Sequence, residues 1–222
     1  MQFAGSHILS VSQFERADVE QLFTVADTMR PYAHRERMTR VLDGAILGSM
    51  FFEPSTRTRI SFGSAFNLLG GEVRETTGFE HSAIAKGESL YDTARVLSGY
   101  SDIIVMRHPE DGSVSEFAAA SRVPVINGGD GANEHPSQAL LDLYTIRSEL
   151  VGRERGLDGL RIAMVGDLRF GRTVHSLSKL LSLFEGLRVS LVSPEALSMP
   201  AGVVEALRKA GHEVLETDAL ET

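Results

Sequence analysis

Apolar residues along the chain alternate between short uninterrupted runs and longer stretches in which they recur at helical spacing. A short apolar run without polar alternation is typical of a strand that is buried on both faces of a parallel sheet. Such runs predict strands at residues 45–53, 102–107, 123–127, 161–167, 188–193 and 212–216.

Helices are expected between these strands, because the apolar residues there fall on one face of a helical period. The first helix includes Ser12 and Glu15, which have the spacing of a capping box, and the second ends at Gly70 and Gly71. The predicted helices cover residues 12–30, 56–69, 90–99, 115–121, 136–150, 172–184 and 202–211.

Strands that alternate with helices predict an α/β fold with mainly parallel sheets flanked by helices. The segment 151–160 is rich in glycine and charge, and it is interpreted as a linker between two domains, 1–150 and 151–222. The second domain would hold three strands and two helices. Two helices cover such a sheet only partly, so we expect some of its apolar surface to stay exposed.

The composition is that of an ordinary globular protein, and it excludes several kinds of site. The chain has 222 residues, 42% of them hydrophobic, and no cysteine, which excludes disulfides and thiolate metal sites. The net charge of -8 argues against nucleic acid as the main partner. Neither a membrane-spanning apolar run nor a signal peptide is evident, so we expect a cytoplasmic protein without a membrane partner.

The stretch FFEPSTRTR at residues 51–59 places hydroxyl and guanidinium donors directly after a predicted buried strand. Ser55 or Thr56 can cap the helix that follows. The free N–H groups of that helix start, with the side chains of Arg57 and Thr58, would form a cradle for a phosphate group. A simple helix cap would explain one such residue, but four of them at one strand end favour phosphate binding.

This stretch resembles the carbamoyl phosphate signature of the aspartate and ornithine carbamoyltransferase family. A nine-residue match of this composition is specific. Other clusters are ambiguous by themselves: Arg107 in MRHP fits a surface ion pair, and His135 and Gln138 in NEHPSQALLDL fit an ordinary helix start. Ser82 and Lys86 in HSAIAKGES fit a solvated loop. All five fall on motifs of the family, in the order that the family has them.

The resemblance implies a role for each residue in binding carbamoyl phosphate and in catalysis. The four cradle residues would hold the phosphate, and Arg57 would offset its charge as it departs. Thr58, Arg107 and His135 would approach the carbamoyl oxygen and stabilise the oxyanion that develops there. Gln138 would bind the carbamoyl NH2 group.

The resemblance also implies a second substrate and a shared site. Ser82 and Lys86 would reach into the active site of a neighbouring subunit, in a homotrimer. The stretch MVGDLRFGRTVHSL at 164–177 resembles the aspartate branch, in which Arg172 and Lys86 would bind aspartate; by itself, Arg172 fits a surface arginine at a helix start. The glycines of this stretch lack the spacing of a dinucleotide-binding loop.

The implied reaction transfers a carbamoyl group from carbamoyl phosphate to the amine of L-aspartate, in pyrimidine biosynthesis. No cofactor and no metal are expected, since the seven histidines lack metal-ligand spacing. The presence of regulatory or other pathway subunits stays open.

Two alternatives to this reaction remain. One is an ornithine carbamoyltransferase. The other is a non-catalytic module that binds carbamoyl phosphate or assembles with a complete partner chain. The second alternative arises because the family's later loops, with further aspartate-binding residues, have no counterpart in the sequence. The second domain is therefore expected to be incomplete relative to the family, in a chain that is either truncated or degenerate.

Overall fold

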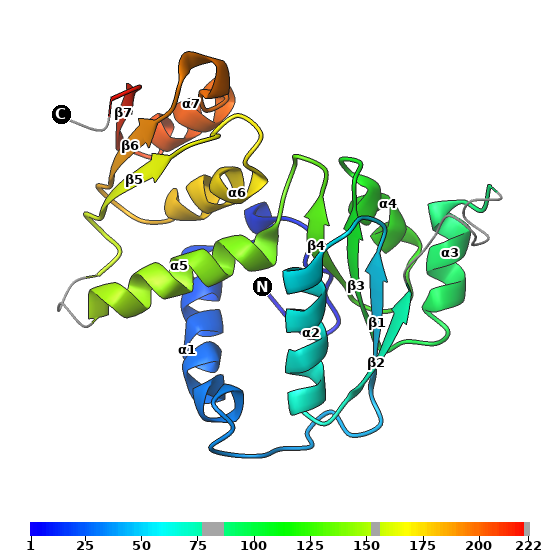
Figure 1. Cartoon of the computed structure of the whole chain (residues 1–222). Helices are drawn as coiled ribbons and strands as arrows, with labels where there is room; N and C mark the ends of the chain where they lie inside the picture. Colours follow the sequence, from blue (N-terminus) through cyan, green and yellow to red (C-terminus); the bar gives the residue numbers. More distant parts are fainter. Residues whose placement is uncertain (77–86, 152–155, 220–222) are drawn as a thin grey trace. The chain divides into compact units, whose positions relative to one another are not determined.

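The computed structural model describes residues 1–76, 87–151 and 156–219, and it confirms the predicted α/β fold (Figure 1). Helices and parallel strands alternate along the chain, and the strands form two separate sheets. Each strand that the hydrophobic pattern predicts is present, with its ends shifted by at most a few residues. Within the described residues, no helix is both long enough and apolar enough to cross a membrane.

Packing divides the chain into two compact units whose bounds differ from the predicted domains 1–150 and 151–222. Helix α5 (Pro136–Val151) belongs to the second unit, because it packs along α6 (Arg172–Leu181). These units reflect packing and not function, so a functional domain boundary near residue 150 stays a prediction. The first unit is Met1–Leu9 with Gln21–Asn133, and the second is Ser10–Glu20 with Glu134–Thr222.

The sheet of the first unit is parallel and has the strand order β2-β1-β3-β4. The chain leaves β1 through α2 to β2, then passes back over β1 through α3 to β3, and continues through α4 to β4. Right-handed crossovers place α2 on one face and both α3 and α4 on the other (Figure 1). The elements are β1 (Ile46–Phe51), α2 (Thr56–Leu68), β2 (Glu72–Thr76), α3 (Leu90–Leu97), β3 (Ile103–His108), α4 (Ser113–Ala120) and β4 (Val125–Asp130).

This reversal of direction makes the carboxyl ends of β1 and β3 a switch point, which is where open α/β sheets bind their ligands. Both faces of the sheet are packed, so the strand ends are held firmly. Leu47, Phe51 and Val105 pack under Phe62 and Phe66 of α2. Full burial of one such side chain contributes roughly 1.5–3 kcal/mol to stability. The other face buries Met50, Ile104, Met106, Val114 and Phe117.

The sheet of the second unit is parallel with the order β5-β6-β7, and one of its faces is open. Both crossovers run in the same direction, so α6 and α7 cover the same face. Met164 on that face is 5% exposed and receives a hydrogen bond from Ser178 of α6, whereas Val165 and Leu215 are 58% and 47% exposed. The expected uncovered apolar surface is thus confirmed. The elements are β5 (Arg161–Val165), β6 (Arg188–Val192), η4 (Glu195–Leu197), α7 (Ala201–Lys209) and β7 (Glu213–Thr217).

Two local predictions differ from the structure. The first helix, α1, spans Arg16–Ala33, and the predicted capping box of Ser12 and Glu15 is wrong. A capping box does form, but around the 3-10 helix η1 (Val11–Gln13), between Ser10 and the last residue of η1. Strand β2 is not predicted by the hydrophobic pattern, because it is a polar, mostly exposed strand at the edge of its sheet.

Candidate functional site

Four donor side chains lie at the N-terminus of α2, at the switch point of the first sheet. Ser55 is the N-cap residue, with φ −153° and ψ 101°, but its hydroxyl makes no capping hydrogen bond. Within the described part of the chain, the side chains of Ser55, Thr56, Arg57 and Thr58 make no hydrogen bond or ion pair. The first N–H groups of a helix also lack intrahelical partners and carry the positive end of the helix dipole. Unused donors are therefore concentrated in this loop.

Arg107 lies on β3 beside this loop. It is the register partner of Phe51 at the end of β1, and the Phe52 N–H donates to its carbonyl oxygen at 2.9 Å. Its Nε donates to Glu53 Oε1 at 2.5 Å, in an ion pair whose side chains are 14% and 25% exposed. Nη1 and Nη2 make no hydrogen bond with any described residue. Glu53 thus holds the guanidinium while two of its nitrogens remain able to bind a ligand.

His108 follows Arg107, and its imidazole is half-buried. Burial lowers the pKa of His108, against the smaller opposing effects of nearby carboxylates, first among them Glu110 and Glu53. Nδ1 accepts a hydrogen bond from the Glu110 N–H at 3.1 Å, and the ring packs against Phe52 with centroids 4.8 Å apart. The imidazole therefore acts here as an acceptor and a packing surface.

A buried carboxylate holds the glycine-rich loop that follows β4. Asp130 is 1% exposed and accepts hydrogen bonds from the side-chain amides of Asn127 and Asn133 at 2.9 and 3.1 Å. It also accepts from the Gly112 N–H at 2.9 Å, and Asn127 donates further to the Leu9 carbonyl at 3.0 Å. This network ties β4 to the N-terminal segment and to the start of α4, so the backbone at the end of β4 is well fixed.

Glu134 and His135 begin the continuous part of the second unit and are only 4% and 5% exposed. The His135 N–H donates to Ser176 Oγ of α6 at 3.2 Å. Glu134 Oε1 accepts from Lys179 Nζ at 2.7 Å and from Ser10 Oγ at 2.8 Å, and Oε2 accepts from a backbone N–H of η1 at 3.0 Å. Glu134 thus joins three segments around the backbone that carries His135.

Gln138 lies in the first turn of α5, and its amide is oriented by a carboxylate one turn later. Its Nε2 donates to Asp142 Oδ1 at 2.8 Å. Burial raises the pKa of Asp142, and this hydrogen bond opposes the rise. Because the amide NH2 group is engaged, the carbonyl oxygen of Gln138 is the atom best able to accept from the NH2 group of a ligand.

Arg172 is the first residue of α6, and two side chains hold the turn that precedes it. Asp167 Oδ1 accepts from the backbone N–H groups two and three residues further on, at 3.1 and 3.0 Å. Nε2 of the buried His175 donates to the Leu168 carbonyl at 2.8 Å. These bonds fix the backbone from which the Arg172 side chain extends.

The predicted site residues fall into three groups. In the first unit, the four cradle residues and Arg107 lie together at the carboxyl ends of β1 and β3. In the second unit, His135 is bonded to the helix that begins with Arg172, and Gln138 lies in the first turn of α5. Ser82 and Lys86 lie outside the described residues. That the three groups form one site stays a prediction.

Three supporting carboxylates, Glu53, Glu134 and Asp142, are not among the predicted site residues. Glu53 belongs to the FFEPSTRTR stretch, and Asp142 is four residues after Gln138, so the sequence carried a signal for both. Glu134 gave no signal, because its partners lie far away in the sequence. Within the described ranges, no group of three or more His, Asp or Glu residues is placed to hold a metal ion.

The family model of the aspartate/ornithine carbamoyltransferase carbamoyl-P binding domain matches residues 6–148, which is more than half of the chain. The chain belongs to the aspartate/ornithine carbamoyltransferase family. The matched range of the carbamoyltransferase model includes the cradle, Arg107, His135 and Gln138.

Two bacterial relatives are similar over nearly the whole chain. The aspartate carbamoyltransferase catalytic subunit of Saccharophagus degradans is 76% identical over 214 residues, which are 96% of this chain and 64% of the relative. That of Cellvibrio japonicus is 70% identical over 222 residues, which are 100% of this chain and 66% of the relative. The chain thus spans about two thirds of the length of these carbamoyltransferases.

Solved structures of aspartate transcarbamoylases have the same fold. The catalytic subunit of the Methanocaldococcus jannaschii enzyme matches with a TM-score of 0.90 and 45% identity, over 97% of this chain and 69% of that chain. The Trypanosoma cruzi enzyme in complex with carbamoyl phosphate and aspartate matches with a TM-score of 0.89 and 44% identity, over 97% of this chain and 72% of that chain. The chain covers only part of the length of these structures, which agrees with the expectation that its second domain is incomplete relative to the family.

Proposed function

We propose that this chain is the carbamoyl phosphate-binding part, with a portion of the aspartate-binding part, of an aspartate carbamoyltransferase catalytic chain. The reaction is carbamoyl transfer from carbamoyl phosphate to L-aspartate, which gives N-carbamoyl-L-aspartate and phosphate for pyrimidine biosynthesis. The similarity to catalytic subunits of this enzyme supports the aspartate branch over the ornithine branch.

The observation that carries this proposal is the set of unused donors around the start of α2. Three hydroxyls, one guanidinium and the first helical N–H groups lie at a switch point without partners among the described residues. A phosphate dianion satisfies all of these donors at once, and the helix dipole adds favourable potential. A structural cap would use the Ser55 hydroxyl internally, which this helix does not do.

Arg107 is suited to the carbonyl group of the same substrate. Glu53 occupies Nε, so Nη1 and Nη2 are left to donate to an oxygen beside the phosphate cradle. As the aspartate amine attacks the carbonyl carbon, a C–N bond forms and negative charge develops on that oxygen. Preorganised donors then stabilise the charge at no further cost of reorganisation. Thr58 and His135 complete this set in the proposed mechanism.

The attack gives a tetrahedral adduct, and its collapse breaks the bond between the carbonyl carbon and the oxygen that bridges it to phosphorus. Phosphate departs toward Arg57 and takes up the proton that the amine loses. The carbonyl oxygen of Gln138, held by Asp142, accepts a hydrogen bond from the carbamoyl NH2 group and so orients the carbonyl for attack. Arg172 binds a carboxylate of aspartate through its planar guanidinium.

The proposal is tested by calorimetric titration of the chain with phosphonoacetamide, a stable mimic of carbamoyl phosphate. We expect saturable binding at one site per chain. Arg57→Ala removes a charge-assisted contact to the phosphonate and should weaken binding about ten- to a hundredfold.

Arg74→Ala is the matched control, because Arg74 is also an arginine of the first unit but lies on the edge strand β2, paired with Glu72. This variant should bind phosphonoacetamide as the parent chain does. Equal affinities of Arg57→Ala and the parent chain would show that the loop is no phosphate cradle.

A further inference from the structure

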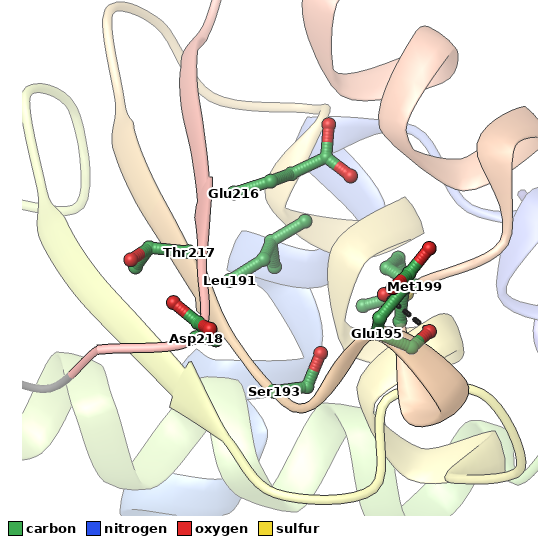
Figure 2. A pocket seen from close by; sticks show the side chains of 8 residues that line it. Leu191, Ser193, Glu195, Met199, Glu216, Thr217 and Asp218 are labelled. Atoms are coloured by element: carbon green, nitrogen blue, oxygen red, sulfur yellow. Dashed lines mark hydrogen bonds between the residues drawn. The ribbon is translucent and has the colours of Figure 1, made fainter.

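A cavity lies at the carboxyl ends of β6 and β7, and none of its lining residues belongs to the proposed carbamoyl phosphate site. It has a volume of about 230 Å³. Figure 2 shows its side chains, which come from the end of β6, from η4 and its flanks, and from β7. Carboxyl ends of parallel strands are the usual ligand edge of an open α/β sheet. The lining residues are Leu191, Ser193, Glu195, Ser198, Met199, Glu216, Thr217 and Asp218.

Ser193 is the group that points to a ligand. It is only 9% exposed, and its side chain extends into the cavity (Figure 2). Its backbone N–H is bonded to the Thr217 carbonyl at 3.0 Å, but its hydroxyl has no hydrogen-bond partner among the described residues. The hydroxyl is accessible from the cavity and engaged with no described protein group, so it is available to bond to a ligand there.

The charges around the cavity select the kind of ligand. Glu195, Glu216 and Asp218 supply three carboxylates, and no lining residue is cationic. Glu216 is paired with Arg208 at 3.0 Å, whereas Glu195 and Asp218 form no ion pair with a described residue. An anion is therefore disfavoured and a cation is favoured.

The apolar part of the lining distinguishes an organic cation from a metal ion. Leu191 and Met199 are 2% and 5% exposed and contribute hydrocarbon surface to the cavity. Over the described residues, no group of three or more carboxylate or histidine side chains is close enough to hold a metal. An ammonium group on a short alkyl chain uses both the carboxylates and the apolar surface.

We propose that this cavity binds a small primary alkylamine as its ammonium cation. The ammonium lies near Glu195 and Asp218 and donates one hydrogen bond to the Ser193 hydroxyl oxygen, while the alkyl chain contacts Leu191 and Met199. This site is independent of the proposed transferase activity, because it uses neither the cradle residues nor Arg107.

The test is a titration of the isotope-labelled chain with 1,4-diaminobutane, followed by NMR. We expect saturable shifts of the backbone amides of residues 193 and 216–218. Ser193→Ala should weaken binding about tenfold, because a hydrogen bond to a charged group is lost. Asp218→Asn should weaken it about fivefold, because one nearby opposite charge is removed.

Two matched variants and one neutral probe complete the experiment. Ser190→Ala changes a serine on β6, the strand that Ser193 directly follows, and Glu213→Gln changes an exposed carboxylate at the opposite end of β7. Both should leave the affinity for 1,4-diaminobutane unchanged. The uncharged 1,4-butanediol should not bind. The proposal is overturned if the diol binds as well as the diamine, or if the diamine gives no saturable shifts at the cavity.

Discussion

At the scale of single residues, buried carboxylates organise the backbone of both compact units. Asp130 accepts hydrogen bonds from Asn127, Asn133 and the Gly112 N–H in the first unit. Glu134 receives bonds from Lys179, Ser10 and η1 in the second. A buried carboxylate is stable only while its donors are present, since an unpaired buried charge is costly. The donors of Glu134 are therefore expected to contribute more to stability than donors in exposed ion pairs usually do.

Lys179→Met should lower the free energy of unfolding by roughly 1–3 kcal/mol, because it removes a cationic donor from the carboxylate of Glu134, which is 4% exposed. The estimate is below the usual cost of breaking a fully buried pair, since the Lys179 side chain is itself 38% exposed. Urea unfolding followed by circular dichroism measures the change.

Lys209→Met is the matched control for this prediction. Lys209 also lies on a helix of the second unit and also pairs with a glutamate, but its side chain is 82% exposed. Its replacement should change stability by less than about 0.5 kcal/mol. In the double variant Glu134→Gln with Lys179→Met, part of the loss should be recovered. Equal stabilities of the two lysine variants would mean that Glu134 does not depend on Lys179.

At the scale of elements, the residues of the proposed site lie at the ends of strands and helices. The cradle depends on a helix start that lacks an internal side-chain cap, and Arg107 depends on the register between β1 and β3. In the second sheet, His212 directly precedes β7, and its Nδ1 accepts from the Leu187 N–H just before β6 at 3.3 Å. A histidine thus joins the starts of two neighbouring strands.

This histidine should make stability depend on pH. Burial lowers the pKa of His212, against a smaller opposing effect of the Leu181 backbone. Above the unfolded-state pKa of about 6.5, the imidazole is neutral in both states, and its contribution to stability is fully present. As the pH falls below that value, the His212 imidazole binds a proton in the unfolded chain but not yet in the folded chain. Stability therefore decreases until the pH reaches the folded-state pKa.

His212→Gln should reduce the loss of thermal stability between about pH 7.5 and about pH 5, because glutamine can accept the same hydrogen bond without titrating. Melting temperatures across this range measure the effect. Burial also lowers the pKa of His7 and His108, so part of the pH dependence should remain. The exposed His34, changed to Gln, should leave the curve unaltered. A curve for His212→Gln that superimposes on the parent curve would contradict the assignment.

At the scale of the whole molecule, we expect the proposed activity to depend on more than one subunit. Resemblance to the family implies that Ser82 and Lys86 complete a neighbour's site in a homotrimer, and both lie outside the described residues. Relatives of the chain are also about half as long again, and one face of its second sheet exposes Val165 and Leu215. Ligand binding is therefore a better test than turnover of whether neighbouring subunits share a site, because a binding measurement does not require a catalytically active chain.

Subunit exchange between Arg57→Ala and Lys86→Ala chains should restore binding of N-(phosphonacetyl)-L-aspartate. Each variant alone has only defective sites. After random exchange at equal concentrations, about a quarter of all interfaces pair an intact cradle with an intact Lys86. Calorimetry should then detect about that fraction of tight sites, while native mass spectrometry confirms exchange. No recovery in exchanged trimers would mean that each subunit binds with its own residues alone.

The α/β fold and the family followed from the sequence by itself, and so did the proposal that residues 55–58 bind phosphate. Each depends on local information: apolar runs and helical spacing specify elements, and the donors of residues 55–58 are contiguous. The hydrophobic pattern did not predict strand β2, because an edge strand need not be apolar. The capping box was misplaced because a 3-10 turn precedes α1, and several polar residues there could cap either element.

Only the tertiary structure decided how distant segments support one another. The strand order places Arg107 beside the loop after β1, where Glu53 holds it. Packing assigns α5 to the second unit and joins Glu134 to Lys179, 45 residues away. The unused Ser193 hydroxyl becomes visible only when the residues around β6 and β7 enclose a cavity. These features depend on burial and on contacts between residues far apart in the chain, which a pattern of apolar and polar positions does not encode.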